Sequence, residues 1–181
     1  MLSTILAFTT MAQATTEQPL KCAAMQSNNA DMAGASVLYG GAQYFFCCGG
    51  CDKKFSAEPT KFTAMAAKSG ATIGKFMFDP ITGKKADLSS AITTDFHGLR
   101  YYFSSEDNKK KFLTKPESFA TSPAKEALTC AVAGDKMASP ADAFAYVDFK
   151  GVRYYMCCAG CLPKMQKEPA KYAKKVKATP V

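Results

Sequence analysis

The chain has 181 residues, of which 48% are apolar and 21% charged, and its formal net charge is +8 at neutral pH. This composition favours a folded globular protein over a disordered one, and the single histidine, His97, excludes most histidine-based metal sites and acid–base catalysts. The positive charge comes mostly from scattered lysines, which we interpret as solvated helix faces rather than a nucleic-acid-binding stripe.

Residues 1–14 carry no charge, are largely apolar and end in Ala12-Gln13-Ala14. A short apolar stretch that ends in small residues is typical of a secretory signal peptide, although no lysine or arginine precedes it; the alternative is an apolar tail without a targeting role. No later apolar run is long enough to span a bilayer. The sequence therefore predicts export to the periplasm or the extracellular space, with no transmembrane segment in the mature chain.

The rest of the chain repeats one pattern, which predicts tandem modules over residues 20–69, 76–122 and 127–177. Each copy has a glycine, an aromatic run, a five-residue cluster, an apolar residue, a proline and an aromatic residue. The matched residues are Gly41, Gly98 and Gly151; Tyr44, Tyr101 and Tyr154; Phe55, Phe112 and Met165; Pro59, Pro116 and Pro169; and Phe62, Phe119 and Tyr172. Such regularity indicates one architecture used three times.

The sequence of each module predicts a β-hairpin followed by helices. In the first copy, residues 36–39 and 42–46 are expected strands around the turn Gly40-Gly41, and glycine at the second turn position is typical of a type I′ hairpin. The proline farther along breaks a helix interior but suits a first helical turn, so two short helices are expected. The predicted fold class is α+β: three small modules, each a β-hairpin followed by short helices around a cysteine cluster.

All eight cysteines fall in the first and third modules, at equivalent positions: Cys22, Cys47, Cys48 and Cys51, then Cys130, Cys157, Cys158 and Cys161. Because Cys47 and Cys51 are about one helical turn apart, their sulfurs can point the same way, and Cys22 can return as a third ligand. If the helix begins at Cys48, that residue can complete a four-thiolate site. Thiolate ligands favour zinc or copper(I).

A disulfide framework is the competing interpretation of the cysteines. An even number in an exported chain fits two bridges per module, and modules of about fifty residues commonly need a metal or disulfides for stability. We favour metal because three cysteines within five residues suit chelation better than cross-linking. The two states can also alternate with redox conditions.

The first module has Cys22, Cys47-x-x-x-Cys51, the run Tyr44-Phe45-Phe46, and Phe55, Pro59 and Phe62. This pattern resembles the YHS domain and the related TRASH domain, in three copies that cover nearly the whole chain after residue 14. The resemblance implies heavy-metal trafficking, resistance or sensing, with a metal transporter or efflux component as partner. It implies as ligands Cys22, Cys47, Cys51, Cys130, Cys157 and Cys161. Cys48 and Cys158 stand where family members often have serine, and their role is left open.

The middle copy has no cysteine and resembles the YHS form, with Asp79-Pro80-Ile81-Thr82-Gly83 at its start, Ser104-Ser105 in the cluster and Asn108 at its end. A hard-metal site of Asp79, Glu106 and His97 is conceivable. However, His97 is expected in the hairpin turn and exposed. We interpret this copy as one that spaces or packs the other two.

No Ser/His/Asp set, phosphate-binding loop or paired-carboxylate motif is present, so we expect no enzyme. The sequence predicts an exported protein that binds zinc or copper(I) at two cysteine sites for trafficking, storage or resistance, and no nucleic acid. Two alternatives stay open. One is a thiol–disulfide redox protein that uses Cys47-Cys48 or Cys48-x-x-Cys51. The other is an interaction module in which metal or disulfides only stabilise the fold.

Overall fold

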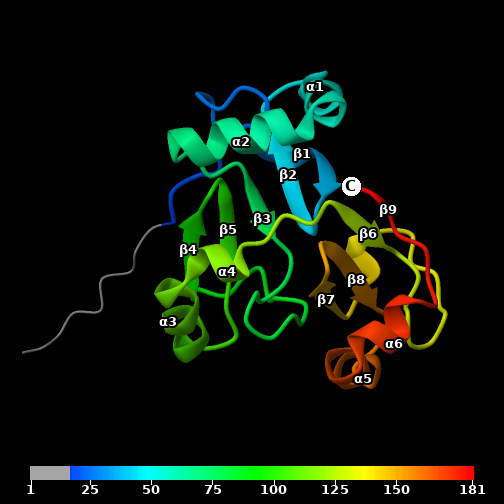
Figure 1. The fold of residues 1–181 in the computed structure, drawn as a ribbon. Coiled ribbons are helices and arrows are strands. Elements are labelled where there is room, and N and C mark those ends of the chain that lie inside the picture. Colours follow the sequence, from blue (N-terminus) through cyan, green and yellow to red (C-terminus); the bar gives the residue numbers. More distant parts are fainter. Residues whose placement is uncertain (1–16) are drawn as a thin grey trace, which may run out of the picture.

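The structure is a computed structural model that describes residues 17–181, so the predicted signal peptide at 1–14 lies outside the described residues. The predicted α+β class is confirmed, with two sheets and helices packed beside them (Figure 1). The strands are β1 (Asp31–Tyr39), β2 (Ala42–Phe46), β3 (Gly74–Phe76), β4 (Thr93–Phe96), β5 (Leu99–Tyr102), β6 (Lys125–Ala127), β7 (Ala145–Phe149), β8 (Val152–Met156) and β9 (Thr179–Pro180). The helices are α1 (Cys51–Ala57), α2 (Pro59–Ser69), α3 (Glu106–Thr114), α4 (Pro116–Phe119), α5 (Cys161–Lys167), α6 (Pro169–Ala173) and the 3₁₀ turn η1 (Pro140–Asp142).

The three hairpins form where the repeat predicts them, as β1–β2, β4–β5 and β7–β8. Both central residues of each turn have positive φ, as a type I′ turn requires. The φ angles are 57° and 80° at Gly40-Gly41, 45° and 85° at His97-Gly98, and 51° and 74° at Lys150-Gly151. The second position is always glycine, which adopts the left-handed region without steric cost.

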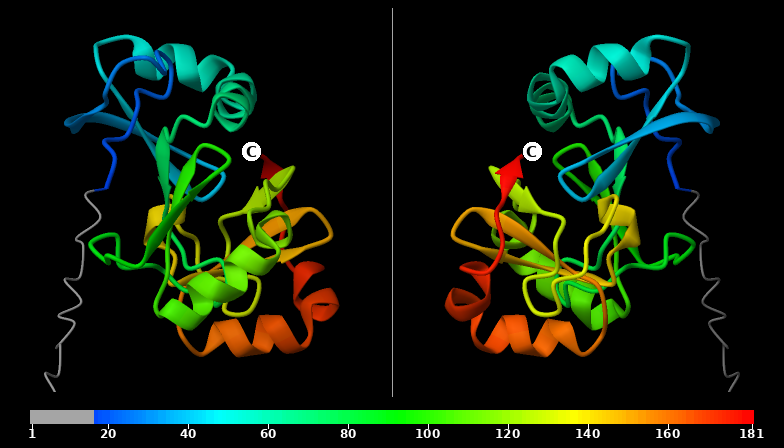
Figure 2. Two further views of the ribbon diagram at one scale, coloured as in Figure 1. Left: turned by 90° about the vertical axis from the view of Figure 1, so that its left-hand side faces the viewer. Right: turned by 90° about the vertical axis from the view of Figure 1, so that its right-hand side faces the viewer.

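The helix pairs are also confirmed. Pro59, Pro116 and Pro169 each begin the second helix of a pair, where a missing backbone N–H costs no hydrogen bond. The residue before each proline leaves the helical region, since the proline ring disfavours α conformation there. In Figures 1 and 2 the three pairs lie at the periphery of the molecule. No helix among residues 17–181 is long and apolar enough to cross a membrane.

Two short strands join the modules in a way that the hairpin prediction did not include. β3 pairs antiparallel with β2 and parallel with β5, so the first two hairpins lie in one sheet of order β1-β2-β3-β5-β4. β6 pairs parallel with β8 and antiparallel with β9, which gives a second sheet of order β7-β8-β6-β9. The segments between modules are therefore structural strands rather than free linkers.

The repeated aromatic positions form the core. Phe55, Phe112 and Met165 are completely buried. In the first two modules the buried phenylalanine packs against the tyrosine of β2 or β5, with ring centroids 4.6 Å apart for Tyr44–Phe55 and 4.9 Å for Tyr101–Phe112. These ring contacts pack the end of each hairpin against the start of the following helix, which is where the five-residue clusters lie.

Candidate metal centres

Three cysteines of the first module converge on one point. Cys22 lies in the loop before β1, Cys47 directly follows β2, and Cys51 is the first residue of α1. Their sulfur atoms all lie within 4.8 Å of one another. Cys22 and Cys51 are buried and Cys47 is half-buried. This first triad is therefore held by the core on one side and open to solvent beside Cys47.

The third module repeats this arrangement. Cys130 follows β6, Cys157 directly follows β8, and Cys161 is the first residue of α5. Their sulfur atoms again lie within 4.8 Å of one another, with Cys130 and Cys161 buried and Cys157 half-buried. We call this set the third triad. The six cysteines that the sequence predicted as ligands are thus brought together in two equivalent groups, close enough to bind a metal ion.

Backbone hydrogen bonds fix the first cysteine of each triad. Cys22 N–H donates to Asn28 O at 2.9 Å, and Cys130 N–H donates to Asp135 O at 2.8 Å, so both loops curl back on themselves. The N–H of Met25 donates to Cys22 Sγ at 3.3 Å. A donor directed at sulfur stabilises a thiolate, which is the form that binds metal.

The thiols of each set perturb one another. A hydrogen bond with Cys48, together with burial, raises the pKa of Cys51, and burial together with a hydrogen bond to Cys158 raises the pKa of Cys161. The same contact lowers the pKa of the exposed Cys158. A metal ion that binds must displace the protons of the buried thiols, so its affinity should rise with pH.

Cys48 and Cys158 belong to neither triad but lie beside them. Both are exposed, and their sulfurs are 2.9 Å and 3.0 Å from those of Cys51 and Cys161. A third contact, between Cys47 and Cys48, measures 3.8 Å. All eight cysteines are free thiols in the structure.

The middle module has an equivalent hairpin and helix pair, but Asp79, Ser104 and Asn108 occupy the aligned ligand positions. We call these three residues the middle triad. Asp79 is 2% exposed, and its Oδ2 accepts from Ser104 N (3.0 Å), Ser104 Oγ (2.7 Å) and Asn108 Nδ2 (2.9 Å). Its Oδ1 accepts from the N–H groups of Ile81 (2.8 Å) and Thr82 (3.3 Å). Burial by itself would raise the pKa of Asp79, but these donors outweigh it and lower the pKa. A hydrogen-bonded carboxylate thus stands where the other modules place thiols.

The structure does not bring together the residues of the hard-metal alternative for the middle module. His97 lies in the hairpin turn with its side chain 47% exposed, and its Nε2 is 3.5 Å from Glu117 Oε1 rather than near Asp79. Within residues 17–181, the two cysteine triads are the groups of histidine, cysteine or acidic side chains that are arranged to hold a metal ion.

Two arginines that the sequence did not predict to be buried lie in the core. Arg100 pairs with Asp95, and Arg153, which is completely buried, pairs with Asp148; each pair faces across its hairpin. Arg153 also donates to Gly40 O at 2.6 Å, which ties the third module to the first. The motif Asp-Phe-x-Gly-x-Arg, which occurs in both hairpins, is the sequence feature that could have indicated these ion pairs.

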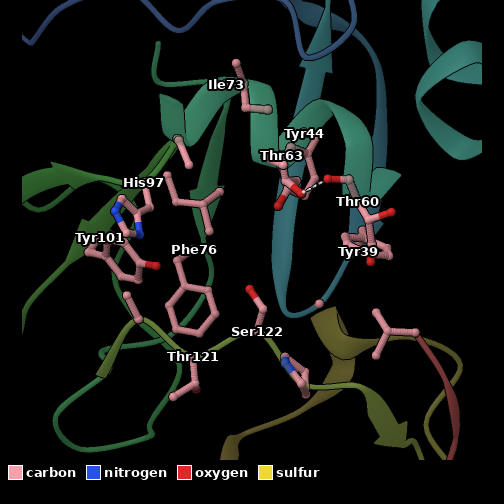
Figure 3. A pocket seen from close by; sticks show the side chains of 18 residues that line it. Tyr39, Tyr44, Thr60, Thr63, Ile73, Phe76, His97, Tyr101, Thr121 and Ser122 are labelled. Carbon is pink, nitrogen blue, oxygen red and sulfur yellow. Dashed lines mark hydrogen bonds between the residues drawn. The ribbon is translucent and has the colours of Figure 1, made fainter. Parts of the chain in front are cut away.

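A cavity of about 310 Å³ lies between the first and middle modules and the chain end (Figure 3). Tyr44 and Tyr101 line it together with Phe76, His97 and Val181. Burial raises the pKa of both tyrosines, so their hydroxyls are protonated at neutral pH. No cysteine lines this cavity, which is therefore separate from the triads.

No family model, no curated protein and no solved structure matches the chain. What can be inferred about function therefore comes from the chain's own repeat and from the geometry of the two triads.

Proposed function

We propose that the chain is an exported, non-enzymatic protein that binds one soft metal ion, zinc or copper(I), at each cysteine triad. Its role would be metal trafficking, storage or resistance. The resemblance of the three modules to YHS and TRASH domains supports this role, and a transporter or efflux component would be the partner.

The donor set fits such an ion. Three thiolates are soft ligands that favour copper(I) and zinc over hard cations. A three-thiolate site leaves zinc, which prefers four ligands, with an open position. In each triad two thiols are buried and the third is half-buried, so an incoming ligand can reach the ion from one side. Accessibility of this kind supports exchange of the ion with a partner.

The contrast between the modules carries the proposal. The backbone of the middle module would hold three side chains at the same place, yet there the side chains of the middle triad satisfy one another by hydrogen bonds. Within the first and third triads the contacts are weaker: the sulfurs of Cys157 and Cys161, for example, are 3.8 Å apart, and thiols are weak donors and acceptors. Convergent thiols that bond one another only weakly suit an external partner, and a metal ion supplies it.

The test is a titration of the reduced protein under anaerobic conditions. Zinc, or copper(I) in a separate experiment, would compete with a chromophoric chelator. We expect two ions per chain, one per triad. Replacing Cys47 and Cys51 by serine should leave one ion, because only the third triad remains. Replacing Cys157 and Cys161 should do the same.

The matched control is the variant Cys48→Ser with Cys158→Ser, which changes the thiols outside the triads. It should still take up two ions. A reduced wild-type protein that takes up no ion, or a Cys47→Ser/Cys51→Ser variant that still takes up two, would overturn the proposal.

A thiol–disulfide redox function is the second candidate. The 2.9 Å separation of the Cys48 and Cys51 sulfurs favours it, as does the 3.0 Å separation of Cys158 and Cys161. This candidate gains weight if the reduced protein binds no metal but exchanges with a thiol–disulfide buffer.

A further inference from the structure

Each cluster places one exposed thiol beside one buried thiol of a triad. Cys48 and Cys158 are exposed, whereas Cys51 and Cys161 are 2% and 4% exposed. The sulfur separations of 2.9 Å and 3.0 Å are less than about 1 Å longer than a disulfide bond. The same pairing occurs in both modules, so it belongs to the repeated architecture.

The backbone between the two thiols also suits a disulfide. Cys51 N–H donates to Cys48 O at 3.4 Å, and Cys161 N–H donates to Cys158 O at 3.2 Å. A turn closed in this way keeps its end Cα atoms less than about 7 Å apart, and disulfides span Cα separations of about 4.4–6.8 Å. The residues inside the turns are Gly49, Gly50, Ala159 and Gly160, which add no bulk between the sulfurs.

The competing pair in the first module is less suitable. Cys47 and Cys48 are adjacent in the chain, and their sulfurs are 3.8 Å apart. A disulfide between neighbouring residues has to distort the peptide bond that joins them, and such distortion is costly. Oxidation should therefore select Cys48 with Cys51 rather than Cys48 with Cys47.

We propose that Cys48–Cys51 and Cys158–Cys161 are redox sites whose oxidation to disulfides removes one ligand from each triad and releases its metal ion. This inference rests on the proposed metal binding, and it joins the two chemistries that would otherwise be rival functions. The exposed cysteine reacts with the oxidant first, and the buried cysteine is the metal ligand that is lost.

The oxidant is a small disulfide such as oxidised glutathione. The thiolate of Cys48 attacks one sulfur of the oxidant, which breaks its S–S bond, forms a mixed disulfide and releases one glutathione thiolate. The sulfur of Cys51 then attacks Cys48, forms the internal disulfide and releases the second glutathione thiolate. Two cysteine sulfurs are oxidised, one oxidant disulfide is reduced, and the metal ion leaves because Cys51 has no thiolate to offer.

The experiment uses the zinc-loaded full chain. Oxidised glutathione is added, and zinc release is followed with a chromophoric chelator while mass spectrometry follows the protein. We expect release of both ions, a chain lighter by about four hydrogens, and no retained glutathione, because two internal disulfides form. Peptide mapping should find Cys48 linked to Cys51 and Cys158 linked to Cys161.

Variants identify the attacking thiol. Cys48→Ser with Cys158→Ser should bind two zinc ions but release them at least about tenfold more slowly. Cys48→Ser alone should give two phases of equal size, one at the wild-type rate and one slow. Release from the double variant at the wild-type rate would overturn the inference, as would mapping of the new bonds to other cysteine pairs.

Failure of this inference can be separated from failure of the proposed function. Zinc content of the reduced protein is measured before the oxidant is added, and two bound ions at that stage support metal binding alone. If those ions stay bound while both disulfides form, oxidation and metal release are uncoupled, and the inference is wrong although the metal sites stand.

Discussion

Asp79 offers a direct measure of how much the hydrogen bonds of the middle triad stabilise the fold. In Asp79→Asn one carboxylate oxygen becomes an amide NH₂, which must face donors whichever way the side chain is turned. If the remaining oxygen takes the position of Oδ2, the N–H groups of Ile81 and Thr82 lose their acceptor; if it takes the position of Oδ1, Ser104 N and Asn108 Nδ2 lose theirs. An unsatisfied buried donor costs about 1–3 kcal/mol. Ile81, Thr82 and Asn108 are half-buried and Ser104 is exposed, so water replaces part of the lost bonding, and we expect a loss of about 1–2 kcal/mol in the free energy of unfolding.

The loss should depend on pH in a defined direction. The hydrogen bonds lower the pKa of Asp79 in the folded protein, so its contribution is present above the unfolded pKa of about 3.9 and is lost as pH falls through the folded value. Wild type and Asp79→Asn should therefore differ most near neutral pH and converge in acid. At low pH the protonated carboxyl, like the amide, no longer offers two acceptors.

Urea unfolding of the reduced protein, followed by circular dichroism near neutral pH and in acid, measures both effects. The control is Asp107→Asn, because the Asp107 side chain is 92% exposed and should leave the urea midpoint unchanged. A loss below about 0.5 kcal/mol for Asp79→Asn, or a loss that stays the same in acid, would refute the role assigned to the middle triad.

Other substitutions test the rest of the account. Arg153→Met should lower the free energy of unfolding by about 2–4 kcal/mol in urea, because it removes the charged hydrogen bonds of the buried guanidinium to Asp148 and Gly40 O, while Asp148, with its side chain 26% exposed, can still be hydrated; a loss below about 1 kcal/mol would show that these bonds are dispensable. Gly41→Ala should lower the melting temperature more than Gly151→Ala, because both have positive φ but only the new Cβ at position 41 meets neighbours, at 3.0 Å and 3.2 Å; equal shifts would count against this packing. Cysteines at all three positions of the middle triad should raise zinc stoichiometry from two to three ions per chain, and an unchanged value in the folded variant would mean that this backbone does not shape a site.

The sequence could predict what depends on short-range chemistry. The hairpins follow from glycine at the second turn position, and the helix breaks follow from Pro59, Pro116 and Pro169, since each acts on its immediate neighbours. The two triads were predictable because the repeat aligns Cys22 with Cys130 and the two clusters with each other. Alignment across copies thus supplied the long-range information that a single copy lacks.

What depended on contacts between modules was not predicted. β3 and β6 have three residues each, too few for a clear alternation pattern. They are strands because distant segments supply partners: β2 and β5 for β3, and β8 and β9 for β6. Burial of Arg153 arises likewise from its contact with Gly40 O in another module. The Asp-Phe-x-Gly-x-Arg repeat was visible, but nothing local shows that the ion pair would be enclosed.

The most direct test of the central claim is a comparison of native and denatured masses of the protein purified without added metal or reductant. Two zinc or copper ions per native chain, lost on denaturation to leave a chain with all eight cysteines reduced, is the result we predict. A metal-free native chain about eight hydrogens lighter than the same chain after full reduction would mean four disulfides and would contradict the claim.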